Sequence, residues 1–475
     1  MSSVEPREPA RPLIWPNIVL QLADALADAP EPIYVVGGAV RDAYAGAPIK
    51  DLDLVTHRGA TPLARQIANL LNGDVFVMDA ERDVARVLID TPDGRLNIDV
   101  AAFRADDLEG DLRERDFTIN AMASQLQGEM TLLIDPLNGE ADLRHKLIRR
   151  CSAQSFTSDP LRTLRAVRLS VQINGHIERE TLADMRRHAA ALPGASPERL
   201  RDESVRVLAG IRPHAAMRIM SVVGLLPAVL PELSTLPSAD REMAFRVIER
   251  LDHILTAISP QRSDNTAAAF GLGAFVVSLD RFRAVLQSHV SAHWANERPH
   301  RALLMIAAAF ACSVPNAASA VDPLCDRLRF SNPERARLIA ILRADRALVA
   351  DLERPLDDLT LHRYWYGPRD AGVDAVLIAL AEELGRAGVA LEQDRWVRVL
   401  ERAQVMLGTF FERAGEVVEP PAVIDGHTVM TALKLRPSAV VGKLLTAIRE
   451  AQVMGRVSDA DSALAVAREV LDAQT

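Results

Sequence analysis

Two segments decide the fold of this chain, YVVGGAVRD at residues 34–42 and DLDLV at residues 51–55. The apolar run before the two glycines is typical of a buried strand, and the alternation in the second segment is typical of a strand with one buried face. Gly37 and Gly38 lack a Cβ atom, so the backbone can turn sharply there and its N–H groups can approach a phosphate closely. Arg41 follows at short range as a candidate phosphate ligand.

The acidic pair in the second segment predicts a metal site. Asp51 and Asp53 are two residues apart on a strand, so both carboxylates leave the same face, about 6.6 Å apart at the base. Two hard oxygen ligands so placed can hold Mg²⁺. A glycine pair alone would be only a tight turn, and an Asp-x-Asp alone a solvated strand edge or loop. Their combination in one strand-turn-strand unit favours nucleotidyl transfer at two metal ions.

Size and composition predict a multidomain and mostly helical protein. A chain of 475 residues exceeds what one hydrophobic core usually supports, so we expect two to four domains. Hydrophobic residues make up 49% of the chain and aromatic residues only 4%, which favours helix over sheet. The net charge is −9, so a polyanion partner would require a local basic patch.

The cysteines and the apolar runs predict a cytoplasmic protein without a membrane partner. Cys151, Cys312 and Cys325 lack metal-ligand spacing and fit a reducing compartment. The longest apolar run, residues 302–314, is too short to span a bilayer, and no signal peptide opens the chain. The first dozen residues, rich in Pro and Glu, are expected to be disordered.

Strand patterns occur only within residues 31–140, and beyond about residue 141 the pattern is almost entirely helical. A turn signal at 91–94 predicts a hairpin, and its second strand carries Asp99. Asp99 is a further candidate metal ligand, although a lone acid in a strand is more often solvated. The expected strands are residues 33–36, 52–55, 75–78, 84–89, 96–101 and 131–134, with a helix at 61–71.

Two basic segments follow the expected metal site. In RDFTINAMA at residues 115–123, Arg, Asp and Asn are costly to bury unless they are paired; the alternative is an Asp-capped helix entry with Arg115 on the surface. Asp159 and Pro160 predict the start of a helix. Its arginines recur every three residues and suit a triphosphate or an RNA backbone, unless the face is simply solvated. These are Arg162, Arg165 and Arg168.

With these motifs in hand, the chain resembles the class II tRNA nucleotidyltransferase (CCA-adding) and poly(A) polymerase family, most strongly over residues 31–212. The resemblance implies an α+β fold, with a DNA-polymerase-beta-like nucleotidyltransferase head built on a small mixed sheet and followed by an all-helical neck, body and tail. The implied parts are an N-terminal extension and leading helix (1–30), the head (31–140), the neck that binds nucleotide and RNA (141–212), the body (213–418) and an RNA-binding tail (419–475).

The resemblance also implies residue roles. Catalysis and Mg²⁺ binding fall to Asp51 and Asp53, and the triphosphate to Gly37, Gly38 and Arg41. Contacts to the nucleotide and its ribose would come from Arg115, Asp116 and Asn120, and the base would be selected by Asp159 and Arg162, with Arg165 and Arg168 continuing the site. The implied reaction adds C and A from CTP and ATP to a tRNA 3′ end, with neither DNA nor membrane as partner.

Three departures from the family pattern matter. Ser158 stands where the family usually has Glu, a carboxylate that would orient Arg162, and Glu114 replaces the first of two arginines. The apolar helix at 307–311 lacks the His-Asp pair of many relatives, so no phosphohydrolase activity is expected. His293 and His300 lie nearby without an evident acid partner and are expected at surface or capping positions.

Other functions remain open at this point. A poly(A) polymerase, or a tRNA enzyme adding only CC or only A, shares the head motifs. An inactive RNA-binding protein has no need of intact Asp51, Asp53 and Arg41. Transfer to a small molecule predicts no basic neck and a smaller helical part.

Overall fold

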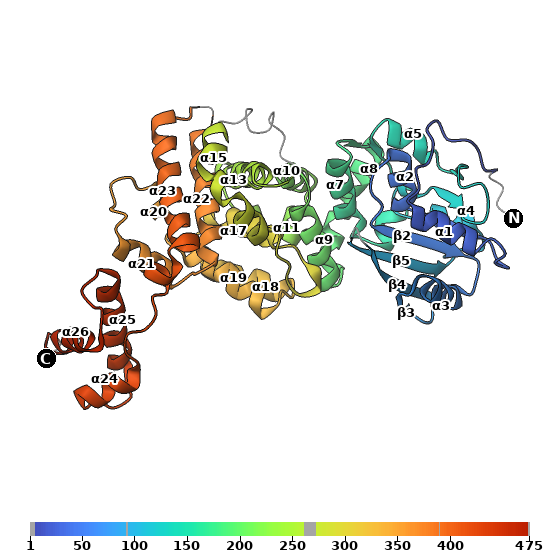
Figure 1. The fold of residues 1–475 in the computed structure, drawn as a ribbon. Helices are drawn as coiled ribbons and strands as arrows, with labels where there is room; N and C mark the ends of the chain where they lie inside the picture. Colours follow the sequence, from blue (N-terminus) through green and yellow to red (C-terminus); the bar gives the residue numbers. More distant parts are fainter. Residues whose placement is uncertain (1–4, 92–93, 261–271, 389, 474–475) are drawn as a thin grey trace. The chain divides into compact units, whose positions relative to one another are not determined.

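The computed structural model describes residues 5–91, 94–260, 272–388 and 390–473 (Figure 1). The chain divides into two compact units, which are described separately below. The first comprises Met1–Arg199 and Ile219–Leu225, and the second comprises Leu200–Arg218 and Leu226–Thr475.

The first unit contains a mixed six-stranded sheet of order β3-β4-β5-β2-β1-β6 (Figure 1). β2 and β5 are parallel, and the other neighbouring strands are antiparallel. The hairpin of β4 and β5 is confirmed, while Pro92 and Asp93 of its turn lie outside the described residues. The strands are β1 (Ile33–Val36), β2 (Asp51–Thr56), β3 (Asp74–Asp79), β4 (Val84–Thr91), β5 (Gly94–Ala102) and β6 (Ala123–Gln125).

Two expectations for this region are wrong. Residues 131–134 form only isolated bridges, and the sixth strand is β6, which pairs with β1. The start of the chain is not disordered from residue 5 onward, because Arg7 bridges Leu133 and forms ion pairs with Asp135 at 3.2 Å and Glu140 at 2.6 Å. Both errors have one cause, since residues 131–134 pair on either side with short, distant segments that carry no strand pattern of their own.

Strand alternation sets which face of the sheet is apolar. Leu52 and Leu54 of β2 enter the main core, where helices α1 (Asn17–Ala25) and α3 (Ala60–Leu71) cover the sheet. Val55 belongs to a smaller cluster with Leu108 and Leu112, on the opposite face. Asp51 and Asp53 share this second face, so the packing of the leucines determines where the carboxylates point.

The remaining elements of the first unit are short and mostly helical. The helix expected to start at Pro160 begins at Arg162, because Pro160 and Leu161 form a turn in which Asp159 Oδ1 accepts the Leu161 N–H at 3.2 Å. The elements are α2 (Gly38–Ala45), α4 (Leu108–Arg113), η1 (Thr118–Asn120), α5 (Gly139–Arg144), β7 (Leu147–Ile148), α6 (Ser155–Ser158), α7 (Arg162–Gln172), β8 (His176–Ile177), α8 (Arg179–His188) and η2 (Ala189–Gly194).

The neck is not wholly helical, contrary to what the resemblance implies, because β7 and β8 pair in parallel, Leu147 with His176 and Ile148 with Ile177. Beyond β8 the described residues form helices and no further strand, as the sequence predicts. α24 to α26 bury an apolar cluster of their own around Val429, Leu444 and Ile448. The helices are α9 (Pro197–Ala209), α10 (Pro213–Val223), α11 (Leu226–Val229), α12 (Pro231–Ser234), α13 (Ser238–Ala257), α15 (Leu272–Leu279), η3 (Asp280–Phe282), α16 (Arg283–Val290), η4 (Ala295–Glu297), α17 (His300–Ala311), α18 (Ala317–Arg327), α19 (Asn332–Arg343), α20 (Ala347–Ala350), α21 (Asp358–Tyr366), α22 (Ala371–Ala387), α23 (Gln393–Glu412), the π-helix η5 (Ala414–Val418), α24 (Gly426–Leu433), α25 (Ala439–Val453) and α26 (Ala460–Asp472). Across the described ranges, no helix is both long enough and apolar enough to cross a membrane.

A buried polar cluster in the second unit corrects the expectation for His300. His300 is buried, and its Nε2 lies 3.0 Å from Asp374 Oδ1; His289 Nε2 lies 2.7 Å from the same oxygen. Arg337 Nε donates to Asp374 Oδ2 at 2.7 Å. His293 is exposed, as expected. The acid partner of His300 was missed because it lies 74 residues away on α22.

This cluster has the side chains of a metal site but the hydrogen bonds of an ion-pair network. Trp294 Nε1 donates to His300 Nδ1 at 3.1 Å, so a neutral His300 ring carries its proton on Nε2, facing Asp374. A protonated nitrogen cannot ligate a metal. Burial opposes the ionisation of Asp374, but hydrogen bonds from His289 and His300 outweigh it and hold the pKa of that carboxyl well below its usual range.

The network predicts a specific stability loss. Asp374→Asn should lower the free energy of unfolding by about 3–5 kcal/mol, because Arg337 would keep a buried charge without its buried carboxylate. Asp370→Asn is the matched control, since Asp370 pairs with the same guanidinium from an exposed position and should cost less than about 1 kcal/mol. Urea denaturation followed by circular dichroism measures both values, and equal losses would contradict the assignment.

Candidate active site

Three carboxylates meet on one face of the sheet. In the parallel pairing of β2 with β5, Asp53 lies opposite Asp99 and Asp51 lies opposite Asn97. Asn97 Nδ2 donates to Asp51 Oδ1 at 2.9 Å, which orients that carboxylate. The sheet register therefore brings together the two acids expected to hold metal and the third candidate.

Asp99 is already engaged by a guanidinium. Arg86 lies directly opposite it on β4, and two parallel hydrogen bonds join them, Nε to Oδ1 at 2.7 Å and Nη2 to Oδ2 at 2.8 Å. This bidentate pair neutralises Asp99. Asp51 and Asp53 form no such pair with a cation among the described residues, so they are the acids available to a metal ion.

The surroundings of Asp53 favour a cation. Burial raises the pKa of the Asp53 carboxyl; Arg115 opposes this shift, while the charges of Asp99 and Asp51 add to it. Carboxylates this close repel one another, and a divalent cation between them relieves that repulsion. The hard oxygen donors and the excess negative charge of this face fit Mg²⁺.

The glycine turn packs directly against this acidic face. Gly37 has a φ of +75°, and a Cβ atom there would lie 2.9 Å from Asp53 Oδ2 and 3.1 Å from Arg115 Nη1. Only glycine satisfies both the backbone angle and this space. Gly38 then begins α2, whose first N–H groups have no partner within the helix and form a site for an anion.

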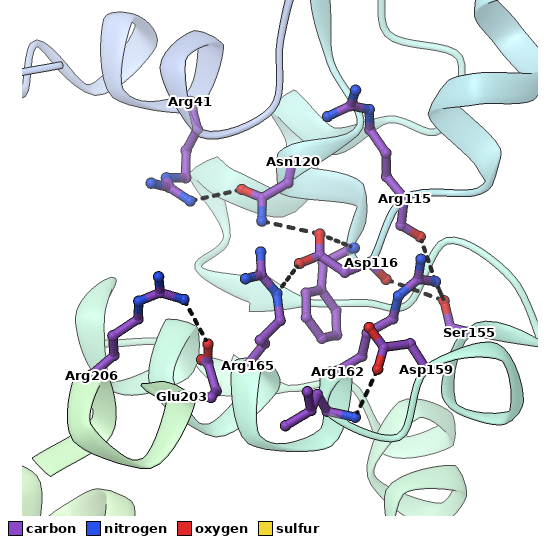
Figure 2. A network of polar contacts seen from close by, with 12 residues as sticks. Arg41, Arg115, Asp116, Asn120, Ser155, Asp159, Arg162, Arg165, Glu203 and Arg206 are labelled. Carbon is purple, nitrogen blue, oxygen red and sulfur yellow. Dashed lines mark hydrogen bonds and ion pairs between the residues drawn. The ribbon is translucent and has the colours of Figure 1, made fainter. Parts of the chain in front are cut away.

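A chain of hydrogen bonds links α2 to α7 (Figure 2). Arg41 Nη1 donates to Asn120 Oδ1 at 2.7 Å, Asn120 Nδ2 donates to Asp116 Oδ1 at 3.2 Å, and Arg165 Nε donates to Asp116 Oδ2 at 2.8 Å. Burial disfavours the charged form of Asp116, but Arg165 and the hydrogen bonds outweigh it and lower the pKa of that carboxyl. The polar groups of the segment at 115–123 are therefore buried in pairs, and the alternative of a surface Arg115 is wrong.

Arg162 is held without a carboxylate. Its Nη1 donates to Arg115 O at 3.2 Å and Ser155 Oγ at 3.3 Å, and its Nη2 donates to Glu114 O at 2.7 Å. Ser158 takes no part, because its hydroxyl donates to Gln154 O at 2.6 Å. In this chain Arg162 is therefore oriented by two backbone carbonyls and by Ser155, whereas the family pattern implies a carboxylate at position 158 in that role.

The stripe on α7 is confirmed. Arg162, Arg165 and Arg168 are half-buried, while Leu164 and Val167 between them are fully buried. The base-selecting candidate Asp159 pairs with Arg199 at 2.7 Å, so the carboxylate is held in place beside the start of α7.

Sequence reasoning missed four residues of this site. Asp111 pairs with Arg115 at 3.1 Å, and their spacing of four along the chain could have indicated it. Arg104 is a further cation, and burial together with the Arg115 charge lowers the pKa of its guanidinium although part of the residue stays exposed. The other two are Arg86 and Arg199.

Comparison with known families and proteins agrees with this geometry. Residues 33–149 match the model of the poly A polymerase head domain, and residues 176–236 match the model of a probable RNA and SrmB-binding site of polymerase A. A CC-adding tRNA nucleotidyltransferase of Geobacter sulfurreducens is 30% identical over 89% of this chain and 88% of its own. An A-adding tRNA nucleotidyltransferase of Deinococcus radiodurans is 28% identical over 91% of this chain and 94% of its own.

Solved structures share the fold. A CCA-adding enzyme in complex with CTP superimposes with a TM-score of 0.64 at 20% identity, over 96% of this chain and 95% of its own. The Thermotoga maritima CCA-adding enzyme complexed with tRNA gives 0.57 at 20% identity, over 97% and 95%. With the Geobacter relative matching most of both sequences, the chain is a nucleotidyltransferase and belongs to the class II tRNA nucleotidyltransferase and poly(A) polymerase family.

Proposed function

We propose that this protein adds C and A to the 3′ ends of tRNA from CTP and ATP without a template strand. The observation that carries the proposal is the buried chain Arg41–Asn120–Asp116–Arg165, which joins α2 to the arginine stripe of α7, while the glycine turn before α2 packs beside Asp53 of the acidic sheet face. The acidic sheet face supplies carboxylates for a cation, and the arginine stripe supplies guanidiniums for a nucleotide.

The catalytic side consists of Asp51 and Asp53, which would hold Mg²⁺. Bound there, Mg²⁺ supplies activation of the RNA 3′-hydroxyl and neutralises charge on the phosphates. Asp99 would join as a ligand only if Arg86 released it. Gly37, Gly38 and Arg41 would bind the triphosphate through backbone N–H groups and a guanidinium.

The nucleotide side completes the site. Arg115, Asp116 and Asn120 would lie along the nucleotide and its ribose, and Arg165 and Arg168 would continue the contacts. Asp116 and Asn120 are buried and hydrogen-bonded, so their side chains are already in position before the ribose binds.

One acceptor, Asp159, and one donor, Arg162, would together fit both C and A. Each of these bases offers an exocyclic amine beside an unprotonated ring nitrogen, so the amine can donate to Asp159 and the ring nitrogen can accept from Arg162. The three hydrogen bonds of Arg162 leave two of its five N–H groups free to donate. G and U offer an oxygen beside a protonated nitrogen, the reverse arrangement.

The helical parts would serve the RNA. Lys434, Arg436 and Lys443 of the tail are exposed and have no ion-pair partner in the described structure, which supports RNA binding there. The described helix at 307–311 carries no His-Asp pair, so we propose no phosphohydrolase activity for the body. Free thiols at all three cysteines fit a cytoplasmic location.

Addition of only CC or only A is the second candidate. The relatives at 28–30% identity include an enzyme of each kind, named CC-adding and A-adding. Because the site residues serve either reaction, only the product distinguishes them.

The first test removes the proposed metal ligands. Asp51→Ala and Asp53→Ala should each lower nucleotide incorporation at least about a hundredfold with little change in the unfolding midpoint, because each variant loses a cation ligand from an otherwise intact sheet face. Asp74→Ala, an exposed acid at the start of β3, is the control and should retain activity. Full nucleotide incorporation by both Asp51→Ala and Asp53→Ala would contradict the proposal.

The second test follows the product. A tRNA lacking its tail is incubated with CTP alone, ATP alone and both, and the products are resolved at single-nucleotide length. We expect two additions with CTP alone and a tail that stops at three with both nucleotides. Two additions with both nucleotides would establish CC-only addition, and a long A tract would establish a poly(A) polymerase. No extension of the tailless tRNA, together with one ATP-dependent addition to a tRNA ending in CC, would establish A-only addition.

The third test uses the glycine turn. Gly37→Ala and Gly59→Ala both place a side chain at positive φ, +75° and +76°. Gly59 lies in the left-handed helical region, where an alanine should cost about 1–2 kcal/mol of stability, whereas Gly37 has a ψ of −138°, where an alanine should cost at least as much. Nothing lies within 4 Å of a Cβ at Gly59, whereas Gly37→Ala would push against Asp53 and Arg115. Only Gly37→Ala should therefore lose about a hundredfold in activity. Equal activities in the two variants would argue against the close packing of this turn on the site.

A further inference from the structure

A cavity of about 460 Å³ lies beside α2 and shares Arg41 with the network described above. All of the elements that line it belong to the first unit. Its lining includes Arg41 and Tyr44 of α2, Arg144 and Lys146 around the end of α5, Gln172 of α7, and Arg11.

The cavity carries uncompensated positive charge. Arg11, Arg144 and Lys146 are exposed, and none forms an ion pair in the part of the chain that the structure describes. Of the nearby acids, Asp42 pairs with Arg41 at 2.8 Å, and Glu140 pairs at 2.6 Å with Arg7, which it shares with Asp135. Three free cations around one concavity, in a protein of net charge −9, make a local field that attracts anions.

A buried tyrosine also lines the cavity. Tyr44 is 5% exposed, and its buried Oη lies near Glu140. Burial, with the charge of Glu140, raises the pKa of Tyr44, so the hydroxyl keeps its proton and adds no negative charge to the cavity.

The cavity adjoins the candidate active site at Arg41. This side chain lines the cavity and also donates to Asn120. Gln172 lies on α7 at the spacing that continues the face of Arg165 and Arg168. A ligand in the cavity would therefore lie next to the proposed triphosphate site and not within it.

We propose that this cavity binds a phosphate group through Arg11, Arg144 and Lys146. Guanidinium forks and an ammonium group are the side chains that recognise phosphate oxygens. Two carriers fit a position beside Arg41, namely pyrophosphate and a phosphodiester of bound RNA. The choice between them rests on the proposed function, whereas the anion site itself does not.

The test compares two double variants of the full-length protein. Arg144→Ala with Lys146→Ala removes two cavity cations. Arg65→Ala with Arg398→Ala removes two exposed cations of α3 and α23 that also have no ion-pair partner in the described structure, so the change in net charge is matched. Thermal unfolding checks that both proteins are folded, and Arg11→Ala provides an independent single change at the cavity.

Two probes distinguish the carriers. Pyrophosphate binding is measured by calorimetry with a chelator and saturating CTP, and binding of a tRNA acceptor-stem hairpin without its tail is measured between about 50 and 200 mM salt. An affinity for pyrophosphate about tenfold weaker than in the matched control, with RNA binding equal, establishes pyrophosphate. Weaker RNA binding with a salt slope reduced by about one or more establishes the phosphodiester.

The proposal is overturned if the cavity variants bind both probes as the control does. A separate titration with CTP alone reports on the nucleotide site. Absence of CTP binding there would count against the proposed function, and the pyrophosphate titration, repeated without CTP, would still decide whether the cavity binds phosphate.

Discussion

The candidate site depends on one buried carboxylate, Asp116. It accepts hydrogen bonds from Asn120 and from Arg165, and Asn120 in turn accepts one from Arg41. These contacts join the segment after α4 to α2 on one side and to α7 on the other. Removing one partner of such a buried pair leaves an uncompensated charge and typically costs about 3–5 kcal/mol. The geometry of the nucleotide side therefore follows from Asp116 remaining ionised and paired.

Short-range patterns predicted most of the catalytic side. The alternation in DLDLV required Leu52 and Leu54 to face the core, and this alone places Asp51 and Asp53 together on the other face. The Arg86–Asp99 pair was also within reach of the sequence. The hairpin register sets Thr91 opposite Gly94 and, through the same ladder, Arg86 opposite Asp99.

What the sequence could not show depends on contacts between distant segments. His300 finds Asp374 74 residues away, and Asp159 finds Arg199 40 residues away, and no local period encodes either pairing. β6 is three residues long and is a strand only because β1 offers it an open edge. Hydrogen bonds from side chains to the backbone also cannot be predicted from the sequence. The two that Arg162 donates to backbone carbonyls are an example.

The cations of the site divide into two groups with different roles. Arg41, Arg115 and Arg165 each pair with a carboxylate, which neutralises part of their charge and stabilises the site. Arg162 contacts only carbonyls and a hydroxyl in the described structure, and its charge stays uncompensated. A glutamate at position 158 could pair with it, and a base would then have to compete with that carboxylate. Ser158 therefore leaves Arg162 oriented by backbone carbonyls and Ser155, with two of its five N–H groups free to donate, so this departure from the family pattern alters how the guanidinium is held.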